Sequence, residues 1–94
     1  MVFPRIVKVL RESVRERRYV MTLHAEQEMC DDRLTIRDVE RAILTGAIVE
    51  RQRDAKMGEW KYRVRGETIH GQDLDVVAKL GPTGKTVIIT VYLE

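Results

Sequence analysis

Features typical of secreted, metal-binding or membrane proteins are scarce in this sequence of 94 residues. Its one cysteine, Cys30, excludes an internal disulfide, and one cysteine with two distant histidines cannot form a structural zinc site. No apolar run approaches membrane length, and the first residues lack the apolar core of a signal peptide. We therefore expect a cytoplasmic protein that contacts no membrane and needs no metal or other cofactor.

Aromatic residues are also few, at 5%, and the formal net charge is only +2 although 34% of the residues are charged. A role in binding nucleic acid therefore cannot rest on total charge and requires Lys and Arg to gather on one face. The apolar fraction of 44% and the length suit a single domain spanning residues 1–94 around one core. Within that core we expect Cys30, beside Met29 in a helix, to be a small buried hydrophobe.

The last ten residues, 85–94, carry the clearest secondary-structure signal. Apolar side chains alternate with Thr, Ile and Tyr at period two, which places on one face Val87, Ile89, Val91 and Leu93. Because residues 87–91 carry no charge, the pattern predicts a central strand rather than an edge strand.

Helical periodicity dominates the first half of the chain. The predicted helices cover residues 4–17, 23–32 and 36–45. Thr22 and Thr35 are suited to cap the second and third helices, and Gly46 is suited to end the third in the left-handed conformation. The short apolar stretch 19–22 is predicted to be either a linker or one turn of strand.

After Gly46 the period changes to two. The predicted strands cover residues 47–53, 59–68, 74–80 and 85–94. Short turns between them indicate an antiparallel meander. We therefore expect an α+β fold in which two to three N-terminal helices pack on one face of a four-stranded antiparallel sheet. Residues 47–53 would form an exposed edge, through which copies of the chain could pair into a homo-oligomer.

The two faces of the predicted sheet differ in character. The face covered by helices would contain Trp60, Tyr62, Val64, Leu74, Val76, Ala78, Val87, Ile89 and Val91. The opposite face would gather Lys61, Arg63, Arg65, Lys79, Thr90 and Tyr92, with Val77 and Ile88 as an apolar floor. Strand register decides whether these cations and the phenol meet, and one sequence does not determine register.

An ordered set of short motifs runs through the chain from Thr22 to Tyr92. The motifs are His24-Ala25, Met29, Asp38-Val39-Glu40, Ile43-Leu44-Thr45-Gly46, Glu59-Trp60-Lys61-Tyr62, Gly81-Pro82-Thr83-Gly84-Lys85 and Ile88-Ile89-Thr90-Val91-Tyr92. This set resembles a family of small bacterial proteins that is distantly similar to the RelE, BrnT and MqsR toxins of toxin–antitoxin pairs. The resemblance implies helices on one side of a sheet and, in active toxins, messenger-RNA cleavage without a metal. Glu28 and Asp32 depart from the pattern, because many relatives carry arginines there.

Metal-free RNA cleavage requires an activated 2′-hydroxyl, a stabilised phosphorane and a protonated leaving oxygen. Our candidate catalytic residues are Lys61, Arg63, Lys79, Tyr92 and His24. Lys61 and Arg63 would bind phosphate, and Lys79 would act as an acid or a second clamp. Tyr92 would donate a proton or stack on a base, and His24 would supply an imidazole for proton transfer. Candidate RNA-binding residues are Arg51, Arg53, Arg65 and Lys85. Each also has a simpler role, in capping, packing or a solvated strand face, and for any single residue that role is the commoner one.

Three hypotheses remain open. The first is a RelE-like ribonuclease toxin that acts on messenger RNA, in the ribosome-associated form that the resemblance suggests, and is held inactive by a cognate antitoxin. The second is a non-catalytic RNA- or protein-binding module on the same fold, which Glu28 and Asp32 favour. The third is a small protein that associates with itself through residues 47–53.

Overall fold

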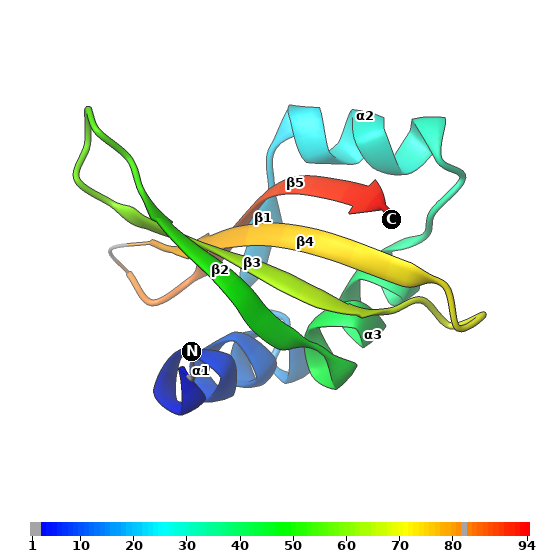
Figure 1. Ribbon diagram of the computed structural model, residues 1–94, viewed down its shortest axis with the longest axis horizontal. Coiled ribbons are helices and arrows are strands. Elements are labelled where there is room, and N and C mark those ends of the chain that lie inside the picture. Colours follow the sequence, from blue (N-terminus) through cyan, green and yellow to red (C-terminus); the bar gives the residue numbers. More distant parts are fainter. Residues whose placement is uncertain (1–2, 82) are drawn as a thin grey trace.

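The computed structural model describes residues 3–81 and 83–94 and shows helices packed against one mixed sheet (Figure 1). The elements are α1 (Pro4–Arg15), β1 (Tyr19–Met21), α2 (Leu23–Asp31), α3 (Ile36–Thr45), β2 (Ala47–Arg53), β3 (Trp60–Glu67), β4 (Asp73–Leu80) and β5 (Thr86–Leu93). The sheet order is β1-β5-β4-β3-β2. The α+β class and the antiparallel run from β2 to β5 are as the periodicity predicts.

The expected four-stranded antiparallel sheet was wrong in one respect, because β1 adds a fifth strand in parallel to β5. Tyr19 pairs with Thr86 and Met21 with Ile88. A strand of three residues is too short to show a period of its own, so its partner had to be found in three dimensions. The added strand confirms that β5 is an interior strand and leaves β2 as the edge on the other side.

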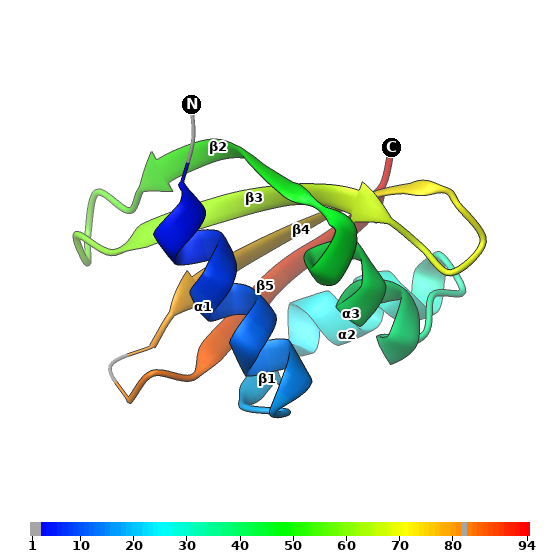
Figure 2. The same ribbon diagram turned by 90° about the horizontal axis from the view of Figure 1, so that it is seen from below.

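The helices do not all cover the same part of the sheet. α1 and α3 lie across one face, whereas α2 runs beside β5 on the side away from β4 (Figures 1 and 2). The backbone N–H of Thr22 donates to the Ile88 carbonyl at 3.0 Å, and the N–H of Val91 donates to Glu28 Oε1 at 3.1 Å. α2 therefore protects the edge of β5 beyond the point where β1 ends.

A β-bulge changes which residues of β5 point inward. Val77 pairs with Thr90 but Ala78 pairs with Ile88, so Ile89 is an extra residue. Because one inserted residue reverses the alternation, Ile88 is buried and Val87 and Ile89 are only half-buried, contrary to the predicted faces. Ile88 thus belongs to the core and not to the open face.

The core lies between the sheet and the helices. Its buried apolar residues are Leu10, Val14, Ala25, Val39, Ala42, Ile43, Ile48, Tyr62, Val64, Leu74, Val76, Ala78, Ile88 and Val91. Two residues expected in the interior are on the surface: Trp60 is 38% exposed and Cys30 is exposed. Trp60 begins β3 at the end of the sheet that projects beyond the helices (Figure 2).

Glycine 46 ends α3 for a reason other than the predicted one. Gly46 has φ −89° and ψ 175°, which is extended and not left-handed. A Cβ there would lie 2.5 Å from the Ala42 carbonyl oxygen and 2.6 Å from that of Arg65. Close packing of α3 on β3 therefore requires the glycine.

The turn predicted at residues 81–84 closes with the N–H of Gly81 donating to the Lys85 carbonyl at 2.7 Å. Gly84 there has φ +83°, whereas Pro82 lies outside the described residues. Across residues 3–81 and 83–94, no helix has the length and apolar character needed to span a bilayer.

Candidate nucleic-acid interface

Strand register brings most of the predicted catalytic residues together on the sheet face opposite α1 and α3. Arg65 pairs with Asp75, which pairs with Tyr92, while in the next row Arg63 pairs with Val77. Farther along, Lys61 pairs directly with Lys79. We call this surface the outer face.

Asp75 is the centre of the outer face, and its side chain is fully buried. Its Oδ2 accepts a hydrogen bond from Arg63 Nη1 at 2.6 Å, and its Oδ1 accepts one from Arg65 Nε at 2.8 Å. Each arginine has a second carboxylate: Arg63 Nε lies 3.2 Å from Glu50 Oε1, and Arg65 Nη2 lies 2.9 Å from Glu94 Oε1. Both guanidinium groups are thus held in fixed orientations by charge-assisted bonds.

The ion pairs determine how this cluster titrates. Burial alone would raise the pKa of Asp75, but the hydrogen bonds from Arg65 and Arg63 outweigh it and lower the pKa to about 2. The same bonds raise the pKa of both arginines. Burial, followed by the nearby charge of Asp75, raises the pKa of Tyr92. At neutral pH Asp75 is therefore a carboxylate and Tyr92 a neutral phenol.

The two lysines of the outer face are also paired. Lys61 Nζ lies 3.7 Å from Asp54 Oδ2, and Lys79 Nζ lies 3.2 Å from Glu59 Oε1. The four cations are thus matched by the carboxylates of Glu50, Asp54, Glu59, Asp75 and Glu94. The predicted residues do meet, but the basic field expected of them is neutralised.

His24 is the one predicted catalytic residue that lies elsewhere. It is exposed in the first turn of α2, where its Nε2 is 3.3 Å from Glu28 Oε1. None of its hydrogen bonds or ion pairs within the described chain reaches the Asp75 cluster. It therefore does not form a catalytic pair with Tyr92 or Lys79.

A second cationic surface lies on the opposite side of the β2–β3 hairpin. Arg51 pairs with Tyr62, and Arg53 pairs with Trp60, so both arginines share the helix-side face of the sheet. The Arg51 guanidinium carbon lies 4.1 Å from the centre of the Trp60 ring and 5.2 Å from that of Phe3, while Arg53 lies 5.5 Å from Trp60. Arg53 Nε also donates to the Gly58 carbonyl. We call these four residues, Phe3, Arg51, Arg53 and Trp60, the arginine–aromatic strip.

The arginine–aromatic strip differs from the outer face in its charge balance. Among the described residues, no carboxylate lies within ion-pair distance of Arg51 or Arg53. The hairpin that carries them extends past α1 into solvent (Figures 1 and 2). Lys85, the remaining RNA-binding candidate, is exposed in the β4–β5 turn, and Arg65 belongs to the outer face. The four candidate RNA-binding residues therefore lie in three separate places: the arginine–aromatic strip, the β4–β5 turn and the outer face.

Sequence reasoning missed Asp75, the residue on which the outer face depends. The available signal was an aspartate flanked by Leu74 and by the apolar run Val76-Val77-Ala78. A carboxylate in a buried strand requires a cationic partner, and Arg63 and Arg65 alternate on the neighbouring strand. That combination predicts an ion-pair cluster, whereas the arginines alone suggest a free basic face.

Within the part of the chain that the structure describes, no group of three or more His, Cys, Asp and Glu side chains is placed to hold a metal ion.

The fold and its surfaces define a small α+β domain with one charge-paired sheet face and one basic aromatic hairpin. Residues 21–93 match the family model described as a domain of unknown function, DUF4258, and the chain belongs to that family. Comparisons with curated proteins and with solved structures gave no match.

Proposed function

We propose that this protein binds single-stranded RNA on the arginine–aromatic strip without cleaving it. The observation that carries the proposal is that Arg51 and Arg53 stack near an exposed tryptophan and have no carboxylate partner among the described residues. Guanidinium groups supply phosphate contacts, and the indole supplies a platform for an unstacked base. On the outer face, by contrast, each cation is already engaged by a carboxylate.

Cleavage is disfavoured by the protonation states of the outer face. A general base should titrate near the working pH, yet the pKa of Asp75 is lowered to about 2. Tyr92 holds its proton more tightly than a free phenol because its pKa is raised by burial. Neither group is therefore suited to remove a proton from a 2′-hydroxyl at neutral pH.

Binding can be tested with a fluorescein-labelled oligouridine in anisotropy titrations at several salt concentrations. We expect Trp60→Ala to weaken binding about tenfold, since stacking on an aromatic side chain contributes about 1–3 kcal/mol per base. Arg51→Gln should weaken binding and reduce the slope of log affinity against log salt by about one. Arg37→Gln, an exposed arginine on α3, serves as the matched control and should change the affinity little. Equal affinities for the Arg51 and Arg37 variants would overturn the proposal.

The second candidate is a RelE-like, metal-independent ribonuclease toxin that acts on messenger RNA and is restrained by an antitoxin. The meeting of Arg63, Arg65 and Tyr92 on the uncovered face favours it. An RNA phosphate would replace the outer carboxylates Glu50 and Glu94, while Asp75 kept both arginines oriented. Induced expression should then arrest growth, and purified protein should cut RNA in a manner lost in Tyr92→Phe. Intact RNA after long incubation, with no growth arrest, eliminates this candidate.

A further inference from the structure

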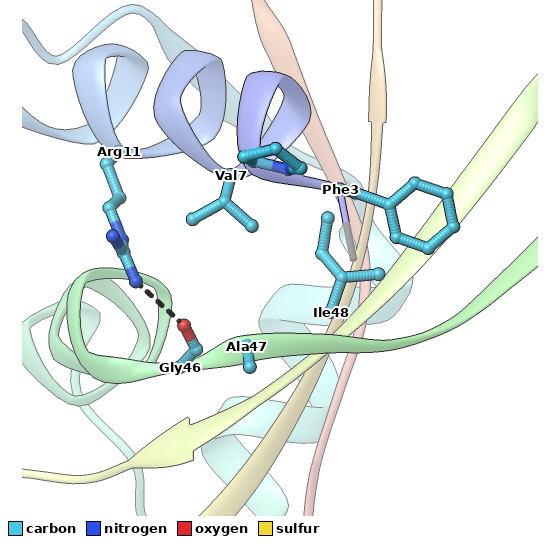
Figure 3. Close-up of a pocket in the computed structure, with 7 residues that line it drawn as sticks. Phe3, Val7, Arg11, Gly46, Ala47 and Ile48 are labelled. Carbon is cyan, nitrogen blue, oxygen red and sulfur yellow. Dashed lines mark hydrogen bonds between the residues drawn. The ribbon is translucent and has the colours of Figure 1, made fainter. Parts of the chain in front are cut away.

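A pocket of about 310 Å³ lies between the start of α1 and the start of β2 (Figure 3). Its walls are mostly apolar and come from both elements. The lining residues are Phe3, Pro4, Val7, Arg11, Gly46, Ala47 and Ile48. A volume of this size can take a branched or aromatic side chain from another molecule.

Arg11 is the one charged residue in this lining, and its guanidinium makes a single hydrogen bond to the described residues. Nη2 donates to the Gly46 carbonyl at 3.0 Å, as Figure 3 shows. Nε is buried and has no hydrogen-bond partner among the described residues, and Arg11 forms no ion pair with them. A guanidinium offers five N–H donors, and the buried Nε cannot reach a ligand, but the Nη donors not used by Gly46 remain for a carboxylate.

The pocket opens beside the unpaired edge of the sheet. β2 is bonded to β3 on one side only, and Ala47 and Val49 are exposed. Backbone groups at such an edge can pair with an extended segment, while an adjacent pocket selects its side chains. The surroundings are basic, since Arg5 and Lys8 are exposed on α1 and Arg51 lies farther along β2. The site therefore favours an acidic segment.

We propose that the α1–β2 pocket and the first half of β2 bind an extended acidic peptide segment of a partner protein. One apolar side chain of that segment occupies the space between Val7 and Ile48, and a neighbouring carboxylate binds Arg11. The segment lies along the β2 edge at Ala47. This site is separate from the arginine–aromatic strip, apart from the shared residue Phe3, and does not depend on RNA binding.

A second copy of this chain is a poorer occupant. Antiparallel pairing of two β2 strands would place Arg51 or Arg53 of one copy beside the Arg11 pocket of the other, bringing like charges together. The pocket and its charge thus favour an acidic partner over self-association.

The test uses the intact protein and a short synthetic peptide in which every second residue is valine and the central residue is glutamate. A matched peptide carries glutamine in its place. We expect ¹⁵N–¹H spectra to shift at Ala47, Ile48 and the Arg11 side chain, and the glutamine peptide to bind about tenfold more weakly, as for loss of one charge-assisted hydrogen bond. Arg11→Met should reduce the affinity similarly, whereas Arg37→Met, an exposed arginine on α3, should change it much less.

Four results would overturn the proposal. The folded wild-type protein could bind the two peptides equally, or bind neither. The peptide could cause shifts that leave β2 unaffected. The mass could increase with protein concentration in the absence of peptide, which would indicate pairing between copies. Arg11→Met also removes the bond to Gly46. If that variant unfolds for this reason, the comparison of the two peptides on the wild-type protein still tests the proposal. RNA is absent throughout, so failure here leaves the RNA proposal untouched.

Discussion

At the scale of single residues, Asp75 determines what the arginines of β3 can do. A buried carboxylate is costly unless it is paired, and here two guanidinium groups compensate it. The same bonds orient Arg63 and Arg65 on the outer face. The cluster therefore stabilises the fold and leaves little free charge for an anionic ligand.

Replacing Asp75 with Asn should lower the free energy of unfolding by about 2 kcal/mol at pH 7, because both arginines lose their buried anion. The folded-state pKa of Asp75, about 2, is below its ordinary value of 3.8. Its contribution is therefore fully present above about pH 5 and is lost as the pH falls through 4 toward 2. Urea unfolding at pH 7, 4 and 3 should show the difference between wild type and Asp75→Asn shrinking with acid. Asp73→Asn, exposed on the same strand, should follow the wild type; a constant difference at all pH values would contradict the linkage.

At the scale of elements, α2 serves as a cover for a strand edge. Glu28 accepts the N–H of Val91, a fully buried residue of β5. Arginine often occupies this position in the family pattern that the sequence resembles, and the departure to glutamate favours the hypothesis of a non-catalytic module. In this chain Glu28 accepts the N–H of Val91, which lies beyond the end of β1 and has no strand partner on that side among the described residues.

Changing Glu28 to Ala should destabilise the protein by about 1–3 kcal/mol, since a buried donor loses its acceptor. Glu28→Gln keeps an acceptor oxygen and should retain most of the stability. Gln27→Ala, exposed in the same helix, controls for helix propensity. Chemical denaturation measures all three, and an Ala variant as stable as the Gln variant would show that the bond is dispensable.

At the scale of the whole molecule, stability is distributed unevenly across the sheet. β4 lies in the middle of the strand order, and half of its residues are buried, whereas β2 is an edge strand with one buried residue, Ile48. The β2–β3 arm also extends beyond the helices (Figure 1). The surface that we propose for RNA therefore lies on the least supported part of the fold.

Amide hydrogen exchange should be slower in β4 than in β2. We expect the amides of Val76 and Ala78 to exchange only through global unfolding, and those of Gln52 and Arg53 to exchange orders of magnitude faster through local opening. Excess oligouridine should slow exchange in the arm and leave the centre of the sheet unchanged. Uniform protection across β2 and β4 would contradict this picture.

Local periodicity was sufficient to predict the three helices, the four long strands and the interior position of β5. Helical and strand periods are set by residues only a few positions apart in the sequence. The capping of α3 by Thr35 and Asp38 is equally local. The strand alternative for residues 19–22 is correct, but the parallel pairing of β1 with β5 and the bulge at Ile89 could not be predicted in this way. Both depend on which distant backbone groups become partners.

The sequence by itself determined the α+β class and assigned several cations and a phenol to the same side of their strands. Only the tertiary structure decided that these side chains meet, that the cations are neutralised, and that the unpaired arginines stack with Trp60 and Phe3 instead. The physical reason is that residue type and alternation assign a charge to a face, whereas register, bulges and packing decide which opposite charge lies beside it. The carboxylates of Glu50 and Glu94 reach the arginines of the outer face through strand pairing, and no spacing in the sequence marks their approach.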